Sequence, residues 1–336
     1  MRKWIGSLAV AVAFLPVAAA LWAGAPEIDD DLFATKRVFP SIGPGLRAIR
    51  RASNGNYYVL ASPSVGIAIF DPQGKQLLVI GAPSPAPVAN KAGRSGIAFG
   101  EDCDLDSQGN VFVADRGGNL VTEFAPDGKP IRSFPVNAPL SVAALPEGEV
   151  ALSTLEADHH VTVYNSEGKV AREFGDLESM SSRSDIDHLL NLGRVQSDPQ
   201  GRVYYGFTYM PEPTVRQFTR FGSATQEFIF TGEDAYPEAS ATRKAIERQE
   251  TRPDPPSFHP ILTAFGVDPV DGDIWMGLHN TLVHFDKDGI RRSEYQIYTT
   301  KGAPVDAMAI LVEPERLLIG SDPLGVYEFH RPDRKH

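Results

Sequence analysis

Charged side chains recur seven or eight residues before glycines that repeat along the chain. They are Arg47 before Gly55, Glu101 and Asp102 before Gly109, and Arg194 before Gly201, with Asp306 near the corresponding place toward the C-terminus. Carboxylate oxygens are the ligands that Ca²⁺ prefers, so Glu101, Asp102 and Asp306 could hold a divalent ion. The same carboxylates could instead pair with Arg47 and Arg194 as a polar lining. Both interpretations require the residues to converge in the fold.

A second set of polar residues lies in loops that follow short apolar runs. These candidates are Asp115, Arg116, His159, Tyr209 and His279. Asp115 could also serve only to accept hydrogen bonds from the backbone of its own loop. Adjacent His159 and His160 on a strand would point to opposite faces, and the histidines lack the spacing of a zinc site. We predict no resident cofactor, with Ca²⁺ or another divalent ion at Glu101, Asp102 and Asp306 as the alternative.

Nucleophilic catalysis finds little support in the sequence. The chain has no G-x-S-x-G motif, and its one cysteine, Cys103, stands between two aspartates that disfavour a thiolate. Cys103 is therefore expected to be a small buried residue. Trp275 and the pair Tyr204 and Tyr205 fall in apolar runs and are expected to pack in the core.

The elements that must position these residues form a repeat. Residues 104–134 predict the end of one strand at Leu105 and three further strands at residues 110–114, 120–124 and 130–134. Alternating apolar residues give the strand period, and Gly109 and Gly128 suit the tight turns between strands. One unit is therefore a four-stranded antiparallel sheet with strands A to D.

The same unit recurs along the chain. The glycines of its first and second turns are separated by 19, 19, 20, 21 and 17 residues in the pairs 55 and 74, 109 and 128, 148 and 168, 201 and 222, and 272 and 289. A sixth unit, residues 313–329, ends after its third strand. Such sheets bury both faces by packing radially, which predicts an all-β fold, a six-bladed β-propeller over residues 33–330. We expect residues 33–39 to supply the missing strand and close the ring.

The second unit resembles the NHL repeat, a family of β-propeller repeats. The segment GEDCDLDSQGNVFVADRGGNLVTEFAPDGKPIRSF, residues 100–134, follows the pattern of that repeat, and the other units follow it less closely. The resemblance implies a propeller scaffold used for binding, or a relative of the lyases and hydrolases built on this fold. Gluconolactonase-like propellers use a central divalent ion held by carboxylates and amides.

Length variation is confined to one side of the predicted ring. The A–B and C–D turns are short, whereas the B–C loops and the connections between units, which emerge on the opposite side, carry insertions at residues 175–193 and 231–260. We call this side the insertion face and the other the turn face. The insertions predict helices near residues 185–192 and 237–249. Binding surfaces are commonly built on such loops, so we expect the site there.

The N-terminus has the layout of an export signal. Arg2 and Lys3 precede an apolar stretch to about residue 23, and small residues suitable for cleavage follow. Residues 1–25 are expected to be a signal peptide or, if they are not cleaved, a membrane anchor. Either alternative places the remaining chain outside the cytoplasm, in the periplasm or secreted.

Composition limits the partners. The 336 residues carry a formal net charge of -11, which repels phosphate backbones and argues against nucleic acid. We expect a monomer that meets a membrane only through an uncleaved N-terminal segment.

The leading hypothesis is an exported repeat protein that acts as a binding module for a protein or small molecule. The alternative is a metal-dependent hydrolase or lactonase of the gluconolactonase-like type.

Overall fold

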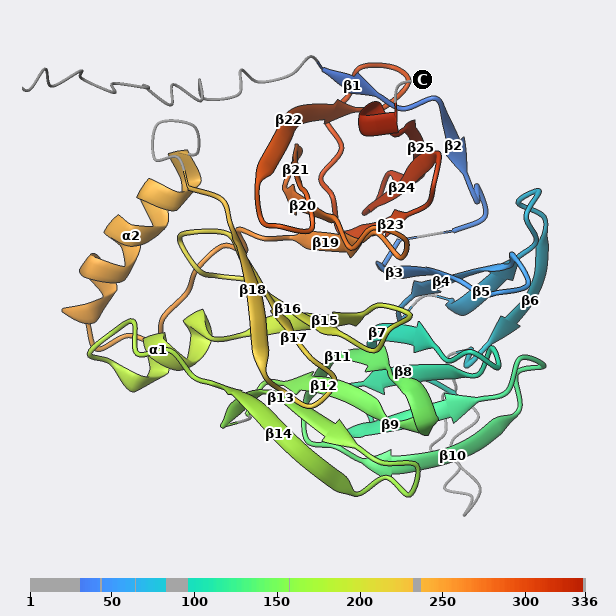
Figure 1. Cartoon of the computed structure of the whole chain (residues 1–336), viewed down its shortest axis with the longest axis horizontal. Coiled ribbons are helices and arrows are strands. Elements are labelled where there is room, and N and C mark those ends of the chain that lie inside the picture. The colour runs from blue at the N-terminus through green and yellow to red at the C-terminus, as the bar shows by residue number, and fades with distance from the viewer. Residues whose placement is uncertain are drawn as a thin grey trace, which may run out of the picture.

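The computed structural model describes residues 31–82, 96–231 and 237–334, apart from Gly43, Ser64 and Ala157. Within them, six separate sheets are arranged around a common axis as the blades of a propeller (Figure 1). The predicted export segment, residues 1–25, lies outside the described residues, as do residues 83–95 and 232–236 of two connections between blades. The predicted six-bladed fold is confirmed.

Blades one to four each have four antiparallel strands in the order in which the chain supplies them. Blade one contains β3 (Leu46–Arg51), β4 (Tyr57–Ala61), β5 (Gly66–Phe70) and β6 (Gln76–Ile80); blade two contains β7 (Gly100–Leu105), β8 (Val111–Asp115), β9 (Leu120–Phe124) and β10 (Pro130–Pro135). Blade three contains β11 (Pro139–Ala144), β12 (Val150–Thr154), β13 (His159–Tyr164) and β14 (Val170–Asp176), with a 3-10 turn, η1 (Pro146–Gly148), after β11. Blade four contains β15 (Gly193–Ser197), β16 (Val203–Phe207), β17 (Thr214–Phe218) and β18 (Ala224–Ile229).

The last two blades involve the N-terminal strands. Blade five contains β19 (Ala264–Val267), β20 (Ile274–Leu278), β21 (Thr281–Phe285) and β22 (Arg291–Tyr298), and the short strand β1 (Leu32–Phe33) pairs in parallel with β22. Blade six contains β23 (Ala309–Val312), β24 (Arg316–Ser321), β25 (Gly325–His330) and the N-terminal strand β2 (Lys36–Val38). Strand β2 pairs antiparallel with β25, so the N-terminal part of the chain completes the last blade, as predicted (Figure 1). The closing strand is shorter than the predicted residues 33–39, because Phe33 belongs to β1 and pairs with blade five instead.

The turns of blade two show why the sequence folds in this way. Gly109 and Gly128 have φ of 83° and 86°, a left-handed conformation that other residues rarely adopt. In the first turn, Asp106 accepts hydrogen bonds from the amides of Gln108 and Asn110, at 2.9 and 2.8 Å. The strands begin and end within one residue of the predicted positions, because alternation and turn residues both specify them.

Apolar side chains fill the spaces between neighbouring blades. Tyr204 packs in a cluster with residues of blade five, and Tyr205 in a cluster with residues of blade three. Trp275, fully buried, packs against blade six. Cys103 is a buried free thiol whose pKa is raised by burial, which confirms its structural role.

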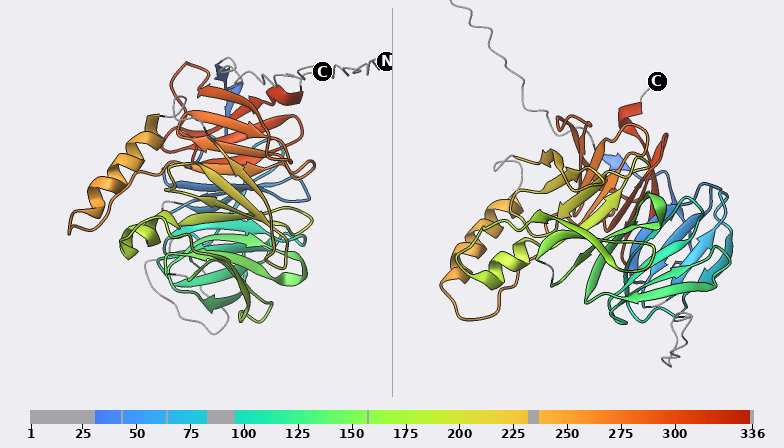
Figure 2. Two further views of the ribbon diagram at one scale, coloured as in Figure 1. Left: turned by 60° about the vertical axis from the view of Figure 1, so that its left-hand side comes forward. Right: turned by 60° about the horizontal axis from the view of Figure 1, so that its bottom comes forward.

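The helices lie on the insertion face. Helix α1 (Ser184–Leu190) and helix α2 (Pro237–Glu250) project from the same side of the ring, beside blade four (Figures 1 and 2). Arg183 donates to the backbone oxygens of Gln249 and Asp254 and so joins the two insertions. The helices stand at the edge of the ring, not across its axis (Figure 1). None of the helices in the described ranges is long and apolar enough to cross a membrane.

Candidate functional site at the channel mouth

Bulges at the start of the inner strands place charged side chains at the mouth of the central channel. Arg47 is the extra residue of a bulge between β3 and β4, and Glu101 is its counterpart between β7 and β8. Blade three has the same feature at Leu140, whereas Arg194 in blade four is paired regularly with Gly206. A bulge re-aims a side chain away from the alternating pattern of the strand. Because of this extra residue, Arg47 and Glu101 lie eight residues before the turn glycine of their blades, whereas Arg194, in a blade without the bulge, lies seven residues before its turn glycine.

Three arginines converge on Glu101. Arg116 Nε lies 2.6 Å from Glu101 Oε1, and Arg47 Nη1 lies 3.8 Å from Glu101 Oε2. Arg194 Nη1 donates to the backbone oxygen of Glu101 at 3.2 Å. Glu101 is almost fully buried, while 42% of the Arg116 side chain is exposed. Three positive charges therefore meet one negative charge, and the nitrogen Nε of Arg47 is buried without a partner in the described part of the chain.

Aromatic residues complete this mouth. The Phe99 ring is contacted by two guanidinium groups, with Arg47 at 5.2 Å and Arg116 at 4.9 Å from its centroid. Tyr209 lies within electrostatic range of Arg194 and Glu101, and burial is the main reason why the pKa of its hydroxyl is raised. The structure thus brings together five of the predicted residues, which are Arg47, Glu101, Arg116, Arg194 and Tyr209. Phe99 joins them without having been predicted.

The carboxylate of Asp115 holds the backbone next to the channel mouth in place. Its two carboxylate oxygens accept hydrogen bonds from the amides of Ala98 at 2.9 Å and Phe99 at 2.7 Å, and Oδ1 also accepts from Gly118 at 3.1 Å. Its side chain is buried. This is the backbone-capping role that the sequence left open for Asp115, and it fixes the segment that carries Phe99.

We expect Asp115→Ala to lower the free energy of unfolding by about 1–3 kcal/mol, because it removes the acceptor of two partly buried amides, those of Ala98 and Phe99. Chemical denaturation of the purified protein would measure this. Asp127→Ala, which removes an exposed turn carboxylate, is the matched control and should leave the unfolding midpoint nearly unchanged. Equal effects of the two substitutions would contradict the role given to Asp115.

Below the mouth, an ion-pair cluster closes the channel. Arg50 lies between two carboxylates, with Nη2 3.1 Å from Asp102 Oδ1 and Nε 3.1 Å from Asp104 Oδ1. The other oxygen of Asp102 accepts the Ser141 hydroxyl at 2.5 Å. Burial alone would lower the pKa of Arg50, but the two carboxylates raise it, so Arg50 stays charged. The space at this level is about 20 Å³, room for about one water molecule.

The turn face carries a wider cavity that the sequence did not predict. Its volume is about 820 Å³, and it is lined by the ends of the inner strands and the first turns of the six blades. Apolar residues such as Leu145 and Val312 form much of its wall, while Arg51 and Asp104 contribute charge. The cluster around Arg50 separates this cavity from the mouth on the insertion face.

The remaining predicted site residues lie apart from the arginine cluster. His159 begins β13, and His279 lies between β20 and β21, where its Nε2 is 3.0 Å from the backbone oxygen of Pro260. Asp306 is exposed between β22 and β23. Asp102 is held by Arg50 and Ser141, so the described contacts do not bring Glu101, Asp102 and Asp306 together as ligands. Both buried carboxylates have cationic partners, as the polar-lining interpretation expects.

The described residues place a different group of metal-ligand atoms close together. Asp273, His284 and Asp333 offer ligand atoms that all lie within 4.8 Å of one another, at the outer part of blade five. This group was not predicted, because Asp273 and His284 lie at different strands and Asp333 follows the last blade. Phe99 and Arg50 were likewise not predicted. Phe99 is an aromatic residue just before β7, and Arg50 is a further charged residue on the inner strand β3, and the spacing of neither sets it apart from other residues of its kind.

The sequence matches no protein-family model and no curated protein. Solved structures share the architecture. A gluconolactonase from Xanthomonas campestris has a TM-score of 0.56 and 14% identity, covering 88% of this chain and 89% of that chain. A catalytically inactive virginiamycin B lyase from Staphylococcus aureus, solved with quinupristin, has a TM-score of 0.54 and 12% identity, covering 87% and 82%. At such identities, the likeness establishes the fold alone, and the chain is a six-bladed β-propeller.

Proposed function

We propose that this protein is an exported, NHL-like propeller that acts as a binding module and takes a carboxylate-bearing ligand at the channel mouth of the insertion face. The observation that carries the proposal is the convergence of three arginines on one acidic residue, with Arg47 and Arg116 at the carboxylate of Glu101 and Arg194 at its backbone oxygen. A carboxylate on the ligand would supply the charge that the cluster lacks. Hydrogen bonds between guanidinium and carboxylate groups are among the strongest in proteins.

The surroundings of the cluster support a binding role. The space lined by Arg47 and Arg194 together with Arg50 is only about 20 Å³, so a ligand would rest outside it, at the mouth, without passing through. Phe99 offers an apolar surface beside the charges, and Tyr209 offers a hydroxyl. The mouth has three guanidinium groups and the carboxylates of Glu101 and Asp115, an excess of one positive charge, whereas the cluster below it has one guanidinium group and two carboxylates.

Calorimetry with a panel of aliphatic and aromatic carboxylates, each paired with its neutral amide, would test the proposal. We expect carboxylates to bind and amides not to, and the double variant Arg47→Gln/Arg194→Gln to weaken binding more than tenfold, since each charged hydrogen bond contributes about 1.5–3 kcal/mol. Arg202→Gln, which removes an arginine paired with Asp198 at the turn face, should leave the affinity unchanged. Equal binding of acids and amides would refute the proposal.

The metal-dependent hydrolase or lactonase receives less support. It requires a divalent ion near Glu101 and Asp102, yet both carboxylates already have arginine partners, and an ion at Asp102 would meet the guanidinium of Arg50. The fold-level likeness to a gluconolactonase is its motivation. Metal analysis of wild type and of Glu101→Gln and Asp306→Asn variants separates the two functions, because only the hydrolase predicts an ion that these substitutions release.

A further inference from the structure

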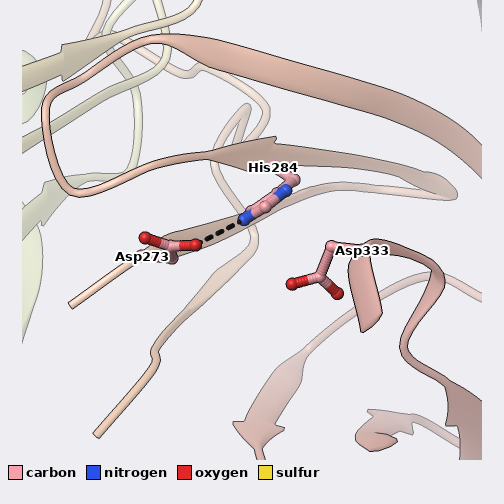
Figure 3. A group of neighbouring side chains, drawn as sticks. All are labelled: Asp273, His284 and Asp333. Carbon is pink, nitrogen blue, oxygen red and sulfur yellow. Dashed lines mark hydrogen bonds and ion pairs between the residues drawn. The ribbon is translucent and has the colours of Figure 1, made fainter. Parts of the chain in front are cut away.

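The outer part of blade five holds a group of side chains whose chemistry the channel does not use. Asp273 directly precedes β20, His284 lies on β21, and Asp333 lies in the 3-10 turn η2 (Pro332–Arg334) that follows the last strand (Figure 3). His284 is buried, Asp273 is half-buried and Asp333 is exposed. Three separate segments thus deliver an imidazole and two carboxylates to one place, with the exposed Asp333 leaving a path from solvent.

The geometry suits a metal ion of the zinc type. His284 Nε2 lies 3.1 Å from Asp273 Oδ2, and the carboxylate of Asp333 faces this pair (Figure 3). Bonds of about 2.0–2.2 Å from Zn²⁺ to nitrogen and oxygen place neighbouring tetrahedral ligands about 3.3 Å apart. The hydrogen-bonded atoms His284 Nε2 and Asp273 Oδ2 have nearly this separation, and the ligand atoms of all three residues lie within 4.8 Å of one another. An imidazole with carboxylates favours Zn²⁺ and similar ions over Mg²⁺ or Ca²⁺.

The local charge favours a divalent cation. Asp268, Asp273 and Asp333 contribute three negative charges, and Arg331, which contacts Asp268 and Asp333, contributes one positive charge. With a neutral imidazole, the sum is 1 − 3, a formal charge of -2. The ammonium group of Lys287 pairs with Asp288 and also lies within electrostatic range of Asp273, so it offsets part of this charge. A carboxylate has about four lone-pair sites, so Asp333 can hold Arg331 and still ligate an ion.

Polar atoms on the strands around His284 are buried without partners, beside the ligand group and outside it. Trp275, His284 and Ser293 are cross-strand neighbours on β20, β21 and β22. Each has a buried polar atom without a partner among the described residues, namely Trp275 Nε1, His284 Nδ1 and Ser293 Oγ. Trp275 also stacks on His284 with the ring centroids 4.3 Å apart. We propose that Asp273, His284 and Asp333 bind a zinc-type divalent cation, which ties the C-terminal turn to blade five.

Titration of the metal-free full-length protein with Zn²⁺ tests this proposal. We expect one ion per chain and a higher thermal midpoint in its presence. Asp273→Asn and Asp333→Asn should each weaken binding by at least ~10-fold, because each removes a charged ligand. Asp127→Asn, which changes an exposed turn carboxylate of blade two, is the control and should bind as wild type does.

Trp275 offers a second readout. Trp4 and Trp22 are the other two tryptophans, so Trp275 alone reports in a full-length chain that carries Trp4→Phe and Trp22→Phe. Co²⁺ should quench its fluorescence, and Zn²⁺ should reverse the quenching. A folded Asp333→Asn variant that binds Zn²⁺ with wild-type affinity would overturn the proposal, as would wild type that binds none. If zinc remains bound in the Glu101→Gln variant, the site at Asp273 is distinct from any ion in the channel. The two proposals can therefore fail independently.

Discussion

Arg331→Met is expected to lower the free energy of unfolding by about 3–5 kcal/mol, because it leaves a buried carboxylate without its cation. Arg331 is fully buried and lies between Asp268, at 2.5 Å, and Asp333, also at 2.5 Å. It further donates to the backbone oxygen of Glu313 at 3.2 Å. Arg331 thus joins the C-terminal segment to blades five and six. Urea denaturation at neutral pH would measure the loss.

Asp268 provides the control and a dependence on pH. Burial raises the pKa of Asp268, but hydrogen bonds from Arg331 and from two turn amides outweigh it, so the pKa lies below its ordinary value of 3.8. The stabilisation is therefore present above pH 4 and is lost as the pH falls through the lowered pKa. The difference between wild type and Arg331→Met should shrink toward pH 3. Asp268→Asn in the Arg331→Met background should restore part of the stability, and no recovery would contradict this account.

Deletion of residues 26–40 is expected to lower the thermal midpoint by an amount on the order of 10 °C or more. The deletion removes β2, which pairs with β25 and completes blade six. It also removes Phe39, a buried side chain whose ring lies 4.5 Å from that of Phe70 and 5.2 Å from that of Tyr57. Without them, the last blade has an open edge and the space beside blade one is unfilled.

Two point variants locate the effect of this deletion. Phe39→Ala should cost about 3–5 kcal/mol, the usual range for a buried phenylalanine. Lys36→Ala removes an exposed side chain of the same strand and keeps the strand pairing, so it should change the midpoint little. Calorimetry of the variants would measure these differences. A midpoint unchanged by the deletion would disprove closure of the ring by the N-terminal strand.

The fold was predictable because its signals are local and repeated. Turn glycines such as Gly109 and Gly128 need a left-handed backbone, and the apolar alternation between them sets the strands. The closing strand was predictable for a different reason, since a sixth unit lacking one strand requires a partner from elsewhere. The short parallel strand β1 was not predicted, because two residues carry no periodicity.

The candidate site was predictable only in part. The position before the turn glycine located Arg47, Glu101 and Arg194, because each of their inner strands begins eight or nine residues before its first-turn glycine. It could not show that Asp102 turns toward Arg50 while Glu101 meets Arg116, since this depends on the bulge. The group of Asp273, His284 and Asp333 depends on where the chain folds back after its last strand, which no local pattern reveals.

The bulges in blades one to three have a consequence for how such a ring can diversify. The residues at these positions are Arg47, Glu101 and Leu140, one basic, one acidic and one apolar. Because a bulged residue stands outside the cross-strand pairing, exchanging its side chain leaves the pairing of the rest of the strand unchanged. Ligand preference at the channel mouth can therefore change one blade at a time, while the sheets that hold the ring together keep their register.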